Sequence, residues 1–124
     1  MSLAHLRHEL LTHVNHVLGF TEMQLDEGSE SRLSVYMPMF ADVHARGRNL
    51  LAIIERELDA GRSCADLVEL DRCLSSEARP ALDQAQRLAY QLHAAGLACA
   101  AEEMDLVSTA LERLLETSRG MVPI

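Results

Sequence analysis

The chain has 124 residues, the size of one domain and enough to bury a hydrophobic core. Hydrophobic residues make up 48% of the sequence but aromatic residues only 3%, so aliphatic side chains and Met must form that core, as in helix bundles. The formal net charge of -8 and the lack of any Lys or Arg run argue against nucleic acid or an anionic membrane surface as a partner.

The sequence gives no sign of a membrane segment or of a metal centre. No stretch approaches the roughly 18 uninterrupted apolar residues of a membrane span, so we expect a cytoplasmic protein without membrane contact. The three cysteines, Cys64, Cys73 and Cys99, have no CxxC spacing, which favours reduced thiols. Of the six histidines, pairs such as His5 and His8 are three residues apart, but no further ligand completes a tetrahedral set. We therefore expect neither a metal nor a cofactor.

The first predicted helix runs from about Leu3 to Leu25, with Ser2 as its N-cap and the helix-breaking residues 27–31 after it. Apolar residues recur along this helix at spacings of three and four, and therefore share one stripe that must face a packing partner. That stripe consists of Leu3, Leu6, Leu10, Val14, Val17 and Thr21.

The opposite side of the same helix carries polar groups. His8 lies about 160° from the apolar stripe when successive residues are placed 100° apart. Thr12, Asn15 and Gly19 follow His8 at intervals of three and four, so they lie beside or above it. We call these four residues the polar row. It presents an imidazole, a hydroxyl, an amide and bare backbone to a docking protein.

This segment resembles the phosphoacceptor box of sensor histidine kinases, which reads His-Glu-Leu-Arg-Thr-Pro-Leu-Asn, followed by a hydrophobic pair, Gly and an aromatic residue. The matching positions are His8, Glu9, Leu10, Thr12, Asn15, Gly19 and Phe20. Leu11 replaces the usual Arg, and His13 replaces the usual Pro. One exposed histidine would be an ordinary surface residue, but seven matches in register favour the phosphoacceptor box.

The resemblance implies a chemical role for several of these side chains. His8 would accept a phosphoryl group, because a neutral imidazole is a nucleophile near neutral pH and can release a proton from its second nitrogen. Glu9 occupies the place of the general base that takes this proton. Thr12 occupies the place of the residue that orients water in family members with phosphatase activity. The partner-binding surface would consist of Leu11, Asn15, Gly19 and Phe20.

A second helix is predicted to end near Gly61, with an apolar stripe of Phe40, Val43, Gly47, Leu50, Ile54 and Leu58. Pro38 suits the first turn of a helix, so the segment from Leu33 to Met37 is interpreted as a separate short turn. Residues 44–51 also resemble the second helix of the kinase hairpin, where a small residue precedes a basic or polar pair and two leucines.

Two more helices follow. The third is bounded by Asp66 as N-cap and by Gly96 as terminator, and its stripe continues in phase on both sides of Pro80. The stripe comprises Leu67, Leu70, Leu74, Ala78, Ala81, Ala85, Leu88 and Leu92. The fourth helix ends at Gly120, and its stripe comprises Leu97, Ala101, Met104, Ser108, Leu111, Leu115 and Ser118.

A faint internal repeat relates the two halves of the chain. A shift of about 68 positions aligns the first box with residues 76–83 without a gap, so that His8 falls on Ser76 and Glu9 on Glu77. Either a hairpin has been duplicated, or two amphipathic helices agree by coincidence. In the kinases this hairpin forms a four-helix bundle with a hairpin of another chain. A duplicated chain could close that bundle alone, as a pseudo-dimer.

These patterns predict an all-α protein, an antiparallel four-helix bundle built from two helical hairpins in one compact domain. Residues 1–61 would form the phosphoacceptor hairpin and residues 62–124 a degenerate second hairpin. The expected function is histidine phosphotransfer in two-component signalling, in which His8 exchanges a phosphoryl group with an aspartate of a response-regulator receiver domain. No Gly-rich phosphate loop, nucleotide lid or asparagine box follows the bundle, so a kinase ATP-binding domain would have to act in trans.

Two alternatives remain open. The chain could be a catalytically silent scaffold of the same descent, which binds signalling partners without carrying phosphate. It could also be a plain dimerisation pair of helices from a larger regulator. Residual apolar surface could in either case drive formation of a homodimer.

Overall fold

The computed structural model describes residues 2–27, 32–58 and 66–122. Its helices are α1 (Leu3–Glu27), the short 3-10 helix η1 (Ser34–Tyr36), α2 (Met37–Glu57), α3 (Leu67–Ala94) and α4 (Ala98–Gly120). No strand occurs in these ranges, which confirms the predicted all-α class. The predicted end of the second helix near Gly61 lies outside the described residues.

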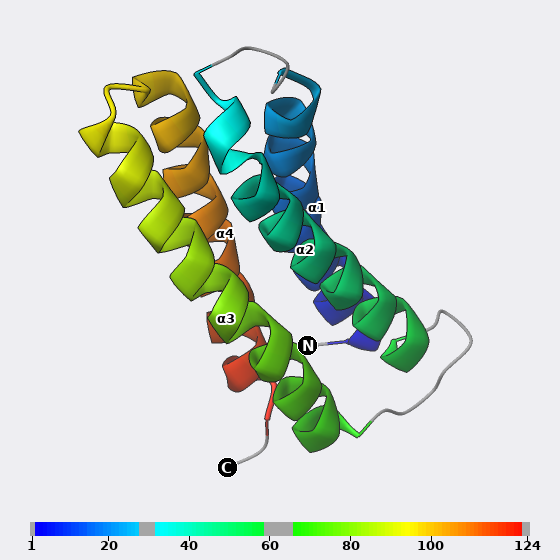
Figure 1. The fold of residues 1–124 in the computed structure, drawn as a ribbon. Coiled ribbons are helices and arrows are strands. Elements are labelled where there is room, and N and C mark those ends of the chain that lie inside the picture. Colours follow the sequence, from blue (N-terminus) through cyan, green and yellow to red (C-terminus); the bar gives the residue numbers. More distant parts are fainter. Residues whose placement is uncertain (1, 28–31, 59–65, 123–124) are drawn as a thin grey trace.

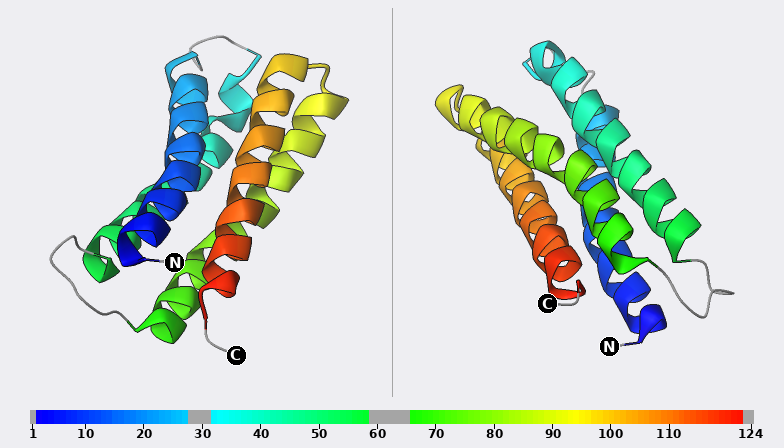
Figure 2. Two further views of the ribbon diagram at one scale, coloured as in Figure 1. Left: turned by 180° about the vertical axis from the view of Figure 1, so that it is seen from behind. Right: turned by 90° about the horizontal axis from the view of Figure 1, so that it is seen from below.

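The four α-helices form a bundle in which each packs against two others. Helix α1 lies against α2 and α4, and α3 lies against the same two helices (Figures 1 and 2). Helices α1 and α2 are antiparallel, because Leu18 packs against Gly47, whereas Thr21, three residues later, bonds to His44, three residues earlier.

The ends of the helices follow the capping rules that the sequence predicted. The Ser2 hydroxyl accepts a hydrogen bond from the N–H of His5 at 3.1 Å, and the Asp66 carboxylate accepts one from the N–H of Glu69 at the same distance. Gly96 adopts a φ of 76° directly after α3, a conformation that side chains disfavour. Ser2 and Asp66 thus cap the beginnings of α1 and α3, and Gly96 follows the end of α3.

Pro38 and Pro80 occupy the helix positions that the sequence predicted for them. Pro38 is in the first turn of α2, and η1 forms the predicted separate turn before it. Helix α3 continues through Pro80, in agreement with the apolar stripe that stays in phase on both sides.

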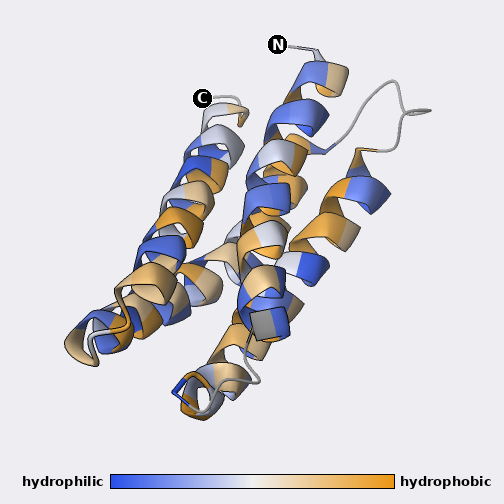
Figure 3. Cartoon of the chain, turned by 90° about the horizontal axis from the view of Figure 1, so that it is seen from above, coloured by the Kyte–Doolittle hydropathy of each residue, from blue (hydrophilic) through white to orange (hydrophobic). Residues whose placement is uncertain are grey.

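The predicted stripes form the core. Their innermost side chains are fully buried, and the largest are Phe40, Leu10, Leu50, Ile54, Leu70, Leu74, Leu88, Leu92, Met104 and Leu111. Leu114, which the predicted fourth stripe left out, is also fully buried. Four stripe residues are only partly buried: Leu3, Leu67, Leu97 and Leu115. Hydrophobic and hydrophilic residues separate along the helices (Figure 3). Burial of each large aliphatic side chain contributes about 1.5–3 kcal/mol, so this core is the main source of stability. None of the helices in the described ranges has the length and apolar character needed to cross a membrane.

Candidate functional site

The polar row lies on the outward side of α1. His8, Thr12, Asn15 and Gly19 are all exposed, whereas Leu10, one of the stripe residues between them, is fully buried. The His8 ring forms no hydrogen bond or ion pair with any residue that the structure describes. An incoming protein could therefore reach both nitrogens of this imidazole without moving another side chain.

The Thr12 side chain is hydrogen-bonded to the backbone of His8, one turn earlier in α1. Its hydroxyl donates a hydrogen bond to the carbonyl oxygen of His8 at 2.8 Å. A hydroxyl has a single proton, so Thr12 can accept a hydrogen bond from a water in this rotamer but cannot donate one to it.

Glu9 turns away from the polar row and towards α4. Its carboxylate lies 3.4 Å from Nε2 of His5, one turn earlier on α1, and its side chain is 39% exposed. Glu9 also lines a cavity of about 310 Å³ at the N-terminal end of α1, together with Thr117 and Gly120 of α4. The residue expected to act as base for His8 thus lies against another histidine, His5, of the same helix.

Leu11 and Phe20, predicted to bind the partner, are less accessible than the polar row. Both are half-buried and pack against the core. The ring of Phe20 lies 6.5 Å from that of His16, centroid to centroid, with an angle of 52° between the planes. Phe20 therefore belongs to the flank of α1 that faces α4.

That flank forms a groove that the sequence did not reveal. A cavity of about 200 Å³ is lined by His13, His16, Phe20, Leu106, Thr109, Ala110 and Arg113, and we call it the α1/α4 groove. Burial lowers the pKa of His13, and the positive charges of His16 and Arg113 lower it further, against the opposing effect of Glu9. Arg113 comes from the other end of the chain, so only the packing of α4 on α1 brings these side chains together.

On its other flank, α1 is joined to α2. Nδ1 of His44 lies 2.8 Å from the Thr21 hydroxyl oxygen, and Nε2 of His44 lies 3.9 Å from the Glu22 carboxylate. Nearby, a Cβ added to Gly47 would lie 3.0 Å from Cδ2 of Leu18. The small residue that the kinase resemblance singled out in the second helix thus permits close packing of α2 on α1.

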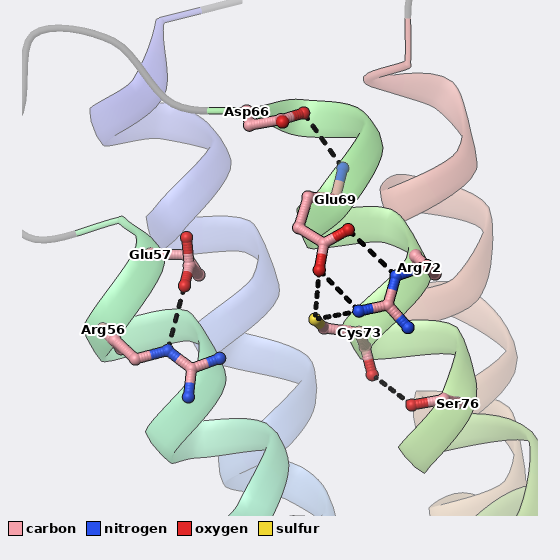
Figure 4. A network of polar contacts seen from close by, with 7 residues as sticks. All are labelled: Arg56, Glu57, Asp66, Glu69, Arg72, Cys73 and Ser76. Carbon is pink, nitrogen blue, oxygen red and sulfur yellow. Dashed lines mark hydrogen bonds and ion pairs between the residues drawn. The ribbon is translucent and has the colours of Figure 1, made fainter.

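The second hairpin places Ser76 much as the first places His8. Ser76 is exposed on α3, and its hydroxyl donates to the carbonyl of Cys73 at 3.0 Å (Figure 4). Glu77 turns towards α2, where its carboxylate lies 3.6 Å from Nη1 of Arg46 and accepts a hydrogen bond from Asn49 at 3.5 Å. Ser76 therefore shares the exposure of His8 but not its imidazole.

A surface network occupies the first turns of α3. Arg72 donates hydrogen bonds to Glu69, which lowers the pKa of that carboxyl to about 2, and Cys73 lies 3.6 Å from the same carboxylate (Figure 4). Cys73 and Cys99 are free thiols, whereas Cys64 lies outside the described residues. Within the described ranges, no three His, Cys, Asp or Glu side chains are grouped so that they could hold a metal ion.

The chemistry of the molecule must be inferred from these side chains. The polar row is accessible, and the α1/α4 groove next to it carries the guanidinium of Arg113 and two imidazoles. No family model, curated protein or solved structure matches this chain.

Proposed function

We propose that this chain is a histidine-phosphotransfer module of cytoplasmic two-component signalling, with His8 as the phosphoacceptor. The observation that carries the proposal is the exposed imidazole of His8, which pairs with none of the described residues, on a helix whose other side is buried in the core. A rigid helix holds the nucleophile in one place, which lowers the entropic cost of aligning it with an incoming phosphoryl group.

The transfer can be written with one bond made and one broken. The unprotonated ring nitrogen of His8 forms an N–P bond while the bond from phosphorus to the donor oxygen breaks and that oxygen leaves with its electron pair. The donor is ATP held by a separate kinase domain or the acyl phosphate of a receiver aspartate. The proton on the second ring nitrogen passes to a base, and Glu9 is the candidate.

The rest of the polar row suits close docking. Asn15 and Gly19 are exposed one and two turns beyond Thr12, and a Cβ built on Gly19 would meet no atom within 4 Å. A receiver domain could therefore approach the backbone of α1 closely, while the amide of Asn15 supplies both a donor and an acceptor.

We further propose that the chain is a single-chain pseudo-dimer of the kinase hairpin. His8 and Ser76 are both exposed, and Glu9 and Glu77 both turn towards the facing helix of the other hairpin. A bundle of this kind has its core complete in one chain, so light scattering should give a monomer at micromolar concentration. A stable dimer that dissociates only on unfolding would contradict this arrangement.

Phosphoramidate labelling tests the role of His8 without any partner. Its P–N bond breaks with release of ammonia as the imidazole N–P bond forms, so an active His8 should gain an acid-labile, base-stable phosphoryl group. His8→Gln should abolish the label. His5→Gln is the matched control, since it removes an exposed imidazole one turn away and should leave the label in place. Label that persists in His8→Gln would falsify the assignment of the acceptor.

The silent scaffold is the second candidate, and the placement of Glu9 favours it. A base shared with His5 and directed towards α4 is poorly placed to serve His8. In that case a receiver domain would still bind the wild-type chain in calorimetry, but neither phosphoramidate nor a kinase would label it.

A further inference from the structure

The two grooves between the hairpins differ in charge. On the side formed by α2 and α3, the Glu77 carboxylate lies against Arg46 and Asn49, so cation and anion meet across the groove. On the side formed by α1 and α4, the middle of the groove holds His13, His16 and Arg113. An ion pair therefore spans the α2/α3 groove, whereas none among the described residues joins the side chains that line the α1/α4 groove.

Arg113 is the charged side chain of the α1/α4 groove, and little opposing charge faces it. Within the described residues no carboxylate forms an ion pair with His16 or Arg113, although the chain carries a net charge of -8. The groups facing His13 are Glu9 and His16 on α1 and Arg113 on α4. A guanidinium without a carboxylate partner among the described residues, in an otherwise acidic protein, attracts an anionic group.

The same groove has an apolar part. Leu106 of α4 is 50% exposed, and the half-buried ring of Phe20 lines the cavity beside it. His16 follows Thr12 by four residues on α1, so the groove adjoins the polar row. On the opposite flank of α1, the mostly exposed carboxylate of Glu22 would repel an anionic group.

We propose that the α1/α4 groove docks the protein that exchanges phosphate with His8, through a segment that carries carboxylates beside an apolar side chain. This inference rests on the proposed function. The carboxylates would pair with Arg113 and could accept a hydrogen bond from the His16 ring, and the apolar side chain would cover Leu106 and Phe20. Pairing at this groove would bring the partner onto α1 from the side of α4 and orient it over His8.

The test uses the full chain, labelled on His8 with phosphoramidate, and receiver domains of the source genome, purified singly and assayed for transfer. With the best acceptor, Arg113→Glu should raise the half-saturating receiver concentration about tenfold and leave the maximal transfer rate within about twofold. Leu106→Ser should raise the half-saturating concentration in the same direction. Phosphoramidate labelling of both variants should match the wild type, because that donor needs no docking surface.

Arg79→Glu is the matched control, since it makes the same charge change at an exposed position of α3. It should change the half-saturating concentration by less than about twofold, because general repulsion is weak and screened. An equal effect of both reversals, or no effect of Arg113→Glu, would overturn the docking groove and leave His8 as acceptor. A chain that phosphoramidate does not label, or that no receiver discharges, would remove the proposed function and this inference together. A dimer that Arg113→Glu converts to a monomer would identify a second copy as the occupant and refute the receiver.

Discussion

The Thr21 hydroxyl of α1 lies 2.8 Å from Nδ1 of His44 in α2, inside the first hairpin. The same hydroxyl lies 2.8 Å from the carbonyl oxygen of Val17, which it can reach as a donor. The hydrogen bond between Thr21 and His44 joins the two helices, and its donor depends on the tautomer of the ring. Nε2 of His44 faces the Glu22 carboxylate at 3.9 Å, so the imidazole lies between a buried hydroxyl and a surface carboxylate.

Removal of this link should destabilise the hairpin. Thr21→Val keeps the shape of the side chain but leaves Nδ1 of His44 without its hydrogen-bond partner, at a cost of about 1–3 kcal/mol. Thr109→Val is the matched control, because Thr109 also donates to a carbonyl four residues earlier but is exposed. It should change stability by less than about 0.5 kcal/mol. Urea denaturation of both variants measures the difference, and equal losses would show that the bond to His44 contributes nothing.

A methyl group should affect stability differently at Gly19 and at Gly47. A Cβ at Gly19 meets nothing within 4 Å, so Gly19→Ala should stabilise α1 by about 1 kcal/mol through helix propensity. A Cβ at Gly47 would lie 3.0 Å from Leu18 and 3.2 Å from Val17, so Gly47→Ala should lose that gain to crowding between α1 and α2. Thermal unfolding of the two variants should therefore rank Gly19→Ala above Gly47→Ala.

Gly19→Ala also tests the polar row separately from stability. If a receiver docks on bare backbone there, the added methyl group should slow transfer from His8 although the protein unfolds at a higher temperature. Transfer at the wild-type rate would exclude Gly19 from the docking surface.

The sequence predicted the helices better than the grooves between them. The spacing of Leu6, Leu10 and Val14 was enough to place one side of α1 in the core, because helical periodicity is local. The same spacing predicted that His8 lies on the exposed side. The caps at Ser2 and Asp66 could likewise be recognised within four residues of sequence.

The α1/α4 groove could not be predicted in this way. It depends on which turn of α4 lies beside His13, and that register is set by packing across 100 residues of chain. The half-buried positions of Leu11 and Phe20 have a similar cause, since both flank the apolar stripe and are covered by neighbouring helices. The phosphoacceptor box fixes residue types along a helix but not how far a neighbouring helix covers them.

The lowered pKa of His13 predicts a loss of stability in acid. In the unfolded chain this ring titrates at its ordinary value of 6.5, whereas burial and nearby cations hold it neutral to lower pH in the folded protein. The unfolded state therefore binds more protons as the pH falls through 6.5, and the free energy of unfolding declines. His13→Gln should shrink the loss of stability between pH 8 and pH 5.5, as followed by urea denaturation.

Arg113→Gln provides an internal check on the cause of that shift. It removes one of the charges that lower the pKa of His13, so the acid loss should become smaller than in the wild type but remain larger than in His13→Gln. An acid loss in His13→Gln as large as in the wild type would mean that other groups dominate the pH dependence.

Leu10 is a core residue of α1, two positions after His8, and its truncation tests how much the core stabilises the fold. Leu10 is fully buried, so Leu10→Ala should cost about 2–5 kcal/mol through lost burial and the cavity that remains. Leu106→Ala removes the same atoms from a side chain that is 50% exposed and should cost well under half as much. Denaturant midpoints with unchanged slopes would establish the comparison, and similar losses would contradict the assigned burial.

Glu9 is the candidate base for His8, and its substitution tests that role. As the general base, it should support labelling of His8 by about 100-fold or more, and Glu9→Gln should remove that contribution. Phosphoramidate labelling of the wild type and of Glu9→Gln measures this contribution. A Glu9→Gln rate within about threefold of the wild type would leave His8 to react without a protein base, since an effect of that size is far below what general-base catalysis provides.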